Sequence, residues 1–141
     1  MENKRYKPLL DKLFYIIWIP TSIIMIILTI LSCINPISLI ITLLVDLFTF
    51  YFLISSISGY VELRKDTIFI KFGFILKREI FYDKIREINK ERKAVCYSML
   101  SLKNSFEHVN IKYNKFDMIT ISVKNNDELI EKLQKHIKKA E

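Results

Sequence analysis

Two long apolar runs fill the first half of the chain. They cover residues 14–33 and 37–57, with Asn35-Pro36 between them. Asn-Pro is typical of turns, and proline disfavours helix at the residue before it. Each run has about 20 residues, which as a helix with ~1.5 Å rise per residue crosses a hydrocarbon core of ~30 Å. The pattern predicts a hairpin of two antiparallel transmembrane helices, in which Pro20 either kinks the first helix or marks its beginning.

The second half of the chain changes to short runs rich in β-branched and aromatic residues, which favour strands. Residues 60–63 and 67–72, with a short polar turn between them, predict a hairpin. Residues 109–113 and 118–123 predict a second, closing hairpin. The runs between the two hairpins predict further strands at 76–80, 83–90 and 97–102.

The spacing of the apolar residues changes again after the last predicted strand. Apolar residues from Leu129 to Ile137 recur at helical spacing, and Asn126 or Asp127 can cap the helix that they predict. The predicted fold class is α+β, with an N-terminal two-helix transmembrane hairpin followed by an antiparallel β-barrel or sandwich of about seven strands and a C-terminal amphipathic helix. The predicted domains are a basic cytoplasmic head 1–12, the hairpin 13–58 with helices of about 14–33 and 37–57, and a cytoplasmic domain 59–141.

Charge is segregated along the chain in the way that membrane proteins require. The chain has 22 Lys+Arg against 15 Asp+Glu, yet residues 13–63 contain no Lys or Arg. The head and the tail therefore hold all the basic residues, and the loop between the two helices has none. The positive-inside rule then puts both termini on the cytoplasmic side of the membrane. A cleaved secretory signal does not fit, because its apolar core would be shorter and would end in a small-residue cleavage site.

The cysteines leave one alternative open at the outer face. Ile30-Leu31-Ser32-Cys33 resembles a degenerate lipobox, so lipidation of Cys33 is an alternative, although leucine fits its second position poorly. Cys33 and Cys96 fall on opposite sides of the predicted membrane and are not expected to pair.

Asp46 is the main candidate for a functional residue. A carboxylate near the middle of a span costs roughly 2.5–3.5 kcal/mol on insertion scales and by default suggests a function. It could bind a proton, pair with a basic group of a partner helix or contact a peptide in the membrane. A structural role is the alternative, with a protonated side chain bonded to a hydroxyl of Thr42, Thr49, Thr21 or Ser22. Neither run carries a basic residue at this depth, which excludes an ion pair within the hairpin.

Basic residues are crowded in the first half of the predicted domain. They could attract anionic lipid or a partner, or they could be an ordinary solvated surface. Nucleic-acid binding has only the net charge of +7 in its favour, and membrane attachment argues against it. The candidate residues for an anionic-lipid or partner surface are Lys65, Lys71, Lys77, Arg78, Lys84 and Arg86.

Catalytic and metal-binding patterns are missing from the sequence. His108 and His136 have no partners at metal-ligand spacing, and neither a nucleophile elbow nor a phosphate-binding loop occurs. We therefore expect no cofactor, no metal site and no enzymatic activity.

A set of short patterns runs through the second half of the chain. It comprises Tyr60, Leu63 and Asp66, then Gly73 after an apolar strand, then 82–88, and 119–122 running into 127–130. In these features residues 60–137 resemble a bacterial pleckstrin-homology-like (PH-like) family, the YyaB-like or sublancin-immunity-type domain, which commonly follows N-terminal membrane spans. Members often have Pro after the Ile-Ser of the last strand, where this chain has Val123.

The resemblance implies a membrane-anchored binding module. One branch of the family is similar to a bacteriocin self-immunity protein, so immunity at the cytoplasmic membrane is one expected function. The alternative is a small accessory subunit of a membrane transporter or another membrane complex. The expected partners are the lipid bilayer and a membrane protein or peptide, and homo-oligomerisation stays open. Eukaryotic PH domains hold inositol phosphates in a basic first loop, but here that turn is only Lys65-Asp66, so phosphoinositide binding is not expected.

Overall fold

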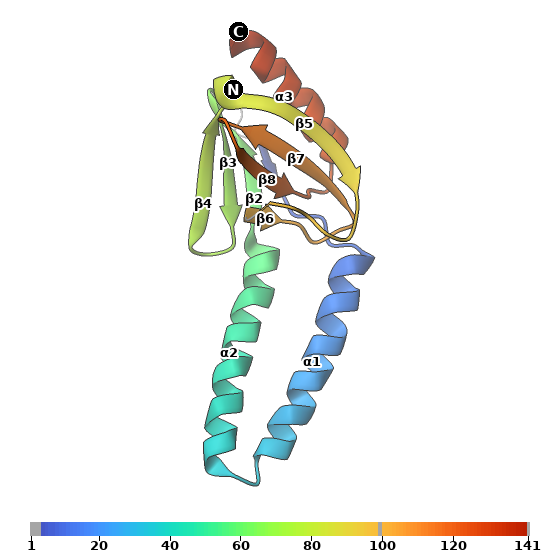
Figure 1. Ribbon diagram of the computed structural model, residues 1–141, viewed down its shortest axis with the longest axis vertical. Helices are drawn as coiled ribbons and strands as arrows, with labels where there is room; N and C mark the ends of the chain where they lie inside the picture. The colour runs from blue at the N-terminus through green and yellow to red at the C-terminus, as the bar shows by residue number, and fades with distance from the viewer. Residues whose placement is uncertain (1–3, 99, 141) are drawn as a thin grey trace.

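The computed structural model describes residues 4–98 and 100–140, which form a helical hairpin and a two-sheet domain (Figure 1). The fold class is α+β, as predicted. The elements in chain order are β1 (Lys4–Tyr6), α1 (Lys12–Ser32), α2 (Pro36–Ser58), β2 (Tyr60–Leu63), β3 (Thr67–Phe72), β4 (Leu76–Phe81), the 3-10 helix η1 (Tyr82–Lys84), β5 (Ile85–Arg92), β6 (Leu100–Leu102), β7 (Glu107–Tyr113), β8 (Asp117–Ile121) and α3 (Asn126–Ala140).

The helices α1 and α2 form the predicted hairpin. The side chains of Asp11 and Asn35 cap them, each accepting a hydrogen bond from a backbone amide two residues on, at 2.8 and 2.9 Å. Pro36 takes the first position of α2, where its missing N–H costs nothing. Pro20 lies inside α1, so the alternative that it marks the beginning of the helix is wrong. Both helices are long and apolar enough to cross a membrane, and almost none of their residues is buried within the structure.

The strands form two sheets. In the first sheet, of order β1-β2-β3-β4, all neighbours are antiparallel. In the second, of order β5-β7-β8-β6, the short strand β6 pairs with β8 in parallel. The prediction of an entirely antiparallel domain is therefore wrong at β6, because the connection from β5 first returns along the sheet. The sheets do not join into a closed barrel within the described residues, and they face each other as layers of a sandwich.

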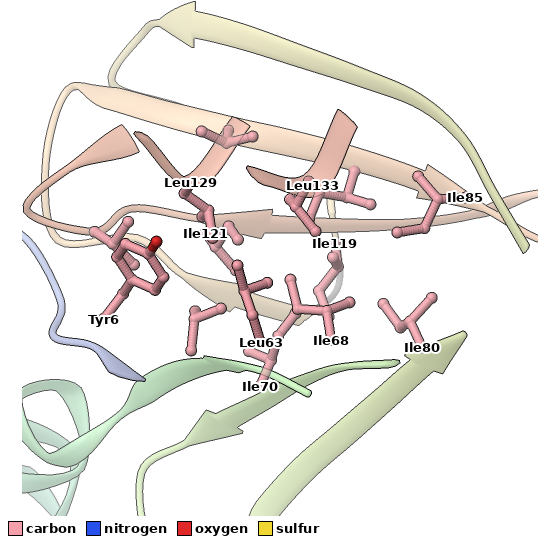
Figure 2. Packing of buried hydrophobic residues seen from close by; sticks show 14 of the residues in the cluster. Tyr6, Leu63, Ile68, Ile70, Ile80, Ile85, Ile119, Ile121, Leu129 and Leu133 are labelled. Carbon is pink, nitrogen blue, oxygen red and sulfur yellow. The ribbon is translucent and has the colours of Figure 1, made fainter. Parts of the chain in front are cut away.

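Alternate residues of the strands point between the sheets and form one apolar core (Figure 2). The helix α3 adds leucines from its inner face, and Tyr82 of η1 stacks on His136 of α3 with 4.8 Å between ring centroids. Burial raises the pKa of Tyr82 to about 12, and its hydroxyl donates to the carbonyl oxygen of Arg64 at 2.8 Å. Core side chains without exposed surface include Ile68, Ile70, Ile119, Ile121, Leu129 and Leu133.

The N-terminal head contributes a strand that the sequence pattern does not predict. β1 pairs antiparallel with β2, and Arg5 lies opposite Glu62. Two more backbone bonds extend the attachment, from the Leu9 amide to the Ser122 carbonyl oxygen at 3.0 Å and from the Lys124 amide to the Lys7 carbonyl oxygen at 3.1 Å. The described part of the head therefore belongs to the two-sheet domain, and both ends of the helical hairpin leave the domain on the same side (Figure 1).

The predicted strands agree with the structure to different degrees. β2 and β3 match their predicted ranges residue for residue, and β4 ends one residue later than predicted. The run 83–90 is divided between η1 and β5, and Leu100–Leu102 form the strand among the described residues of the run 97–102. α3 begins at Asn126, whose side-chain oxygen accepts a hydrogen bond from the Val123 amide at 2.9 Å, so this residue closes the turn before the helix.

The loop between β6 and β7 attaches the domain to the ends of both long helices, α1 and α2. The Asn104 side chain donates to the Ser56 carbonyl oxygen of α2 at 2.9 Å, and the Phe106 amide donates to the Asp11 carboxylate at 3.0 Å. Only Gly59 separates α2 from β2. The atoms around Gly59 leave no room for a side chain, since a Cβ there would lie 2.8 Å from the Lys71 carbonyl oxygen. The joint between hairpin and domain is thus short and tightly packed.

A buried carboxylate fastens β1 to the rest of the first sheet. Glu62 is only 3% exposed, and it accepts hydrogen bonds from Arg5 Nε at 2.5 Å and Arg64 Nε at 3.1 Å. The two guanidinium groups lie over the rings of Tyr60 and Phe69, at 5.0 and 4.1 Å from their centroids. The hydrogen bond from Arg5 is the main cause that holds the pKa of Glu62 below its ordinary value.

Replacing Glu62 with glutamine should lower the free energy of unfolding by roughly 1–2 kcal/mol at neutral pH, since the arginines are partly exposed and lose less than buried partners would. The pKa of Glu62 is lower in the folded protein than the ordinary value of 4.5 in the unfolded chain. The ionised carboxylate therefore stabilises the fold at pH values above 4.5, and this stabilisation is lost as the pH falls through the folded pKa. Urea unfolding of the full chain in detergent at pH 7 and below pH 4 would measure both effects. Asp83→Asn, at an exposed residue of η1, is the control; an equal loss in both variants would contradict the assignment.

Candidate functional site

Polar side chains join α1 and α2 within the apolar hairpin. Thr29 Oγ1 donates to Asp46 Oδ2 at 2.7 Å, and Ser32 Oγ lies 2.8 Å from Thr42 Oγ1. The Thr29 hydroxyl also lies 2.9 Å from the Met25 carbonyl oxygen, so its single proton is shared between two acceptors. The Asp46 carboxyl is therefore bonded at Oδ2 by a hydroxyl that also donates to a backbone carbonyl oxygen.

The hydroxyl partner of Asp46 differs from those predicted. Thr42 bonds to Ser32, and the hydroxyl of Thr49 donates to a carbonyl oxygen of its own helix. Thr21 and Ser22 likewise donate to carbonyl oxygens one turn earlier in α1. The alternative that one of these four hydroxyls bonds to Asp46 is wrong, because the register of the helical hairpin places Thr29 of α1 opposite Asp46 of α2.

A cleft of about 450 Å³ opens between the two helices beside Asp46. Its walls are mainly apolar, and the second carboxyl oxygen, Asp46 Oδ1, is buried there with no hydrogen-bond partner among the residues that the structure describes. A buried polar atom without a partner is costly, and most such atoms in proteins are satisfied. The cleft is lined by Ser22, Met25, Ile26, Thr29, Ile30, Asp46, Thr49, Phe50 and Leu53.

This arrangement can accept a hydrogen bond or a cation from a group that enters the cleft. Neither helix offers a cation after Lys12, since residues 13–58 contain no Lys or Arg, and the hydroxyls of Ser22 and Thr49 in the cleft donate to carbonyl oxygens of their own helices. A donor from a second polypeptide segment in the membrane would satisfy Asp46 Oδ1, and interhelical hydrogen bonds of this kind stabilise helix association by roughly 0.6–2 kcal/mol. The cleft thus presents one carboxylate oxygen in mainly apolar surroundings.

The six basic candidates do not lie on one surface. Lys71 and Lys77 face each other across β3 and β4 at the end nearest α2, whereas Lys65 lies in the β2–β3 turn at the opposite end of these strands. Lys77, Arg78 and Lys84 share a shallow surface hollow with Glu79 and Phe81. Arg86 lines a different hollow with Glu87, and its guanidinium donates to the Lys115 carbonyl oxygen at 3.1 Å.

The two cysteines and the two histidines do not come together in one site within the described part of the chain. Cys33 is exposed at the end of α1 and Cys96 lies in the β5–β6 connection, both as free thiols. His108 is buried, with Nδ1 3.0 Å from the Phe106 carbonyl oxygen, and His136 stacks on Tyr82. No group of three or more His, Cys, Asp or Glu that could hold a metal ion occurs among residues 4–98 and 100–140.

A family comparison covers the whole two-sheet domain apart from β1. The model of the bacterial PH domain matches residues 59–137, which run from the joint after α2 into the last turns of α3. No curated protein and no solved structure gave a match. The matched segment is more than half of the chain, and its two sheets closed by a C-terminal helix are the architecture that the sequence resemblance implied. The chain therefore belongs to the bacterial PH domain family.

Proposed function

We propose that the chain is a binding module anchored in the bacterial cytoplasmic membrane, with both termini and the PH domain on the cytoplasmic side. The apolar lengths of α1 and α2, and the basic residues that flank them, support this topology. The pairing of β1 with β2 requires that the head and the domain lie on one side of any membrane that the hairpin crosses. PH domains are in general binding modules, which favours binding over catalysis.

The observation that carries the proposal is the unsatisfied oxygen of Asp46 in the cleft between the helices. We propose that a segment of a partner lies in this cleft and donates a hydrogen bond or a positive charge to Asp46. Polar and ionisable residues within membranes face partners or cavities because lipid cannot satisfy them. The partner is thus bound at the level of the bilayer, and the PH domain adds a second surface at the cytoplasmic face.

Two kinds of partner suit the cleft. The first is a membrane-active peptide, and binding it would make this chain a bacteriocin self-immunity protein of the sublancin-immunity type. The second is a transmembrane helix of a transporter or another complex, for which this chain would be an accessory subunit. The mainly apolar walls of the cleft and the Asp46 carboxylate in its lining suit either segment.

Replacing Asp46 with leucine should weaken binding of the partner roughly 3- to 30-fold and reduce its recovery in a pull-down from mild detergent, because the apolar side chain accepts no hydrogen bond. The variant Asp46→Asn keeps an acceptor oxygen but loses the negative charge. It should still bind a partner that donates a neutral hydrogen bond, and it should no longer bind a partner that contributes a positive charge. Thr49→Val is the control, since Thr49 lines the same cleft and bonds only within α2. Unchanged recovery with Asp46→Leu would contradict the proposed site.

Expression in a strain sensitive to a co-encoded peptide separates the two partners. Protection that is lost with Asp46→Leu and kept with Thr49→Val is the result expected of an immunity protein. Full sensitivity of the strain that expresses the wild-type chain would refute immunity and leave the accessory-subunit function.

A further inference from the structure

The turn between β3 and β4 carries apolar residues where turns usually carry polar ones. The last cross-strand pair is Phe72 with Leu76, so Gly73, Phe74 and Ile75 form the turn itself. Turns favour Gly, Asn, Asp, Ser and Pro, yet here Phe74 is 50% and Ile75 73% exposed, and Leu76 beside them is 57% exposed. We propose that this turn is a third membrane contact, in which Phe74, Ile75 and Leu76 enter the boundary between lipid headgroups and acyl chains.

The position of the turn beside α2 supports this contact. The Phe74 ring lies 5.9 Å, centroid to centroid, from the ring of Tyr51, which is about two turns, or ~10 Å, from the end of the helix. Gly73 lies against Ser55, so closely that a Cβ on it would be 2.7 Å from the Ser55 Cβ. The β3–β4 turn therefore lies beside the C-terminal end of α2, the end that would meet the membrane surface (Figure 1).

Charge around the turn fits a lipid surface. Lys71 and Lys77 lie directly opposite each other on β3 and β4, an arrangement that destabilises a sheet unless negative charge is near. Neither lysine forms an ion pair within the described part of the chain. Long basic side chains beside an apolar tip can bury their stems and reach toward phosphate groups, each charge contributing to attraction to anionic lipid. A membrane surface supplies both the apolar layer and the phosphates.

The turns at the far end of the domain have a different composition. The β2–β3 turn carries Lys65 and Asp66, and the β7–β8 turn carries Asn114 and Lys115 beside one exposed aromatic ring, Phe116. Single exposed apolar residues are common on protein surfaces, whereas a run of them marks an interaction site. The run is confined to the end of the first sheet that adjoins the helical hairpin.

The inference rests on the membrane anchoring proposed above, and one experiment separates the two. The full chain with Cys33→Ser and Cys96→Ser receives a single cysteine by Ile75→Cys, Ile27→Cys or Phe116→Cys, three positions exposed in the structure. Each protein is labelled with the fluorophore NBD and reconstituted in vesicles of phosphatidylethanolamine and phosphatidylglycerol. Lipids with a nitroxide near the top of the acyl chain should quench NBD at position 75 roughly two-fold, since interfacial segments reach ~5–10 Å into this boundary.

The reference positions decide what each outcome means. Position 27, inside α1, should be quenched by lipids labelled deeper in the chain, and absence of that quenching would refute the membrane anchoring itself. Quenching at 27 with none at 75, as at position 116, would overturn only the third contact. Protection of position 75 from aqueous iodide without lipid quenching would show that a protein surface, such as a second copy, covers the turn, and would also overturn it.

Discussion

Alanine in place of Leu133 is expected to lower the free energy of unfolding of the PH domain by roughly 3 kcal/mol, within the range of about 2–5 kcal/mol for buried Leu→Ala changes. Leu133 has no exposed surface and belongs with Leu129 to the apolar core, where α3 contacts η1, β5 and β7 (Figure 2). Its removal leaves a cavity at the place where α3 closes the sandwich. Small domains are stable by only about 5–15 kcal/mol, so the variant loses a large fraction of its stability.

Pulse proteolysis of the full chain in detergent micelles, over a series of urea concentrations, would measure this loss. Gln134→Ala is the matched control, because Gln134 is the exposed neighbour on the same helix and alanine is an equally good helix former. We expect the control to unfold at the wild-type urea concentration. A Leu133→Ala protein with an unchanged midpoint would show that α3 does not close the core.

Gly73→Ala should destabilise the packing of the β3–β4 turn on α2 by roughly 2 kcal/mol or more, through backbone strain and a steric clash together. Gly73 has φ of +79°, a conformation that residues with a Cβ adopt only at a cost. The new Cβ would also lie 1.6 Å from Ser55 Oγ and 2.7 Å from Ser55 Cβ. Rotation of the hydroxyl relieves the first contact and leaves the second, so the turn must move away from the helix.

The second-site change Ser55→Gly gives the test its control, because it removes both of these atoms. Hydrogen exchange of the β3 and β4 amides should be faster in Gly73→Ala and should return most of the way in the double variant, with the strain at position 73 remaining. Equal acceleration in the two backgrounds would mean that Ser55 is not what confines the turn. In vesicles, the single variant should also weaken lipid contact at position 75.

The elements predicted correctly are those with a strong local period. Both apolar helices are visible because residues 14–33 and 37–57 lack charge except for Asp46. β3 alternates between core residues such as Ile68 and outward residues such as Phe69, and α3 shows its inner leucines at helical spacing. β2 places the apolar Val61 and Leu63 in the core at a period of two, although Glu62 between them is also buried. In each case the signal lies within the segment itself.

The elements that were missed depend on partners far along the chain. β1 is only three residues long, and it becomes a strand because β2 and the buried Glu62 lie beside it in space. The parallel pairing of β6 with β8 depends on the path of the β5–β6 connection, for which composition has no signal. Local propensity cannot reveal an edge strand of this kind, because tertiary pairing decides it.

The candidate site divides in the same way. Asp46 was identifiable because a lone carboxylate in an apolar run is conspicuous, and the structure places it on a cleft. Its partner Thr29 depends on the hairpin register, which Asn35-Pro36 leaves undetermined. The basic residues looked like one surface because they are close in sequence, but strand alternation and the hairpin turns send Lys65 and Lys71 to opposite ends of the first sheet.

The pairing of β1 with β2 has a consequence for how the protein is made. On the membrane topology proposed above, the first strand leaves the ribosome long before its partner, and it must wait while both spans insert and the chain returns to the starting side. A molecule whose second span fails to return keeps β1 and the domain on opposite sides of the bilayer, so β2 retains an unpaired edge and Glu62 lacks one of its arginines. Unpaired edges expose incompletely folded chains to aggregation and degradation. On that proposed topology, the first sheet can be completed only in molecules whose hairpin has been inserted with both ends on the same side.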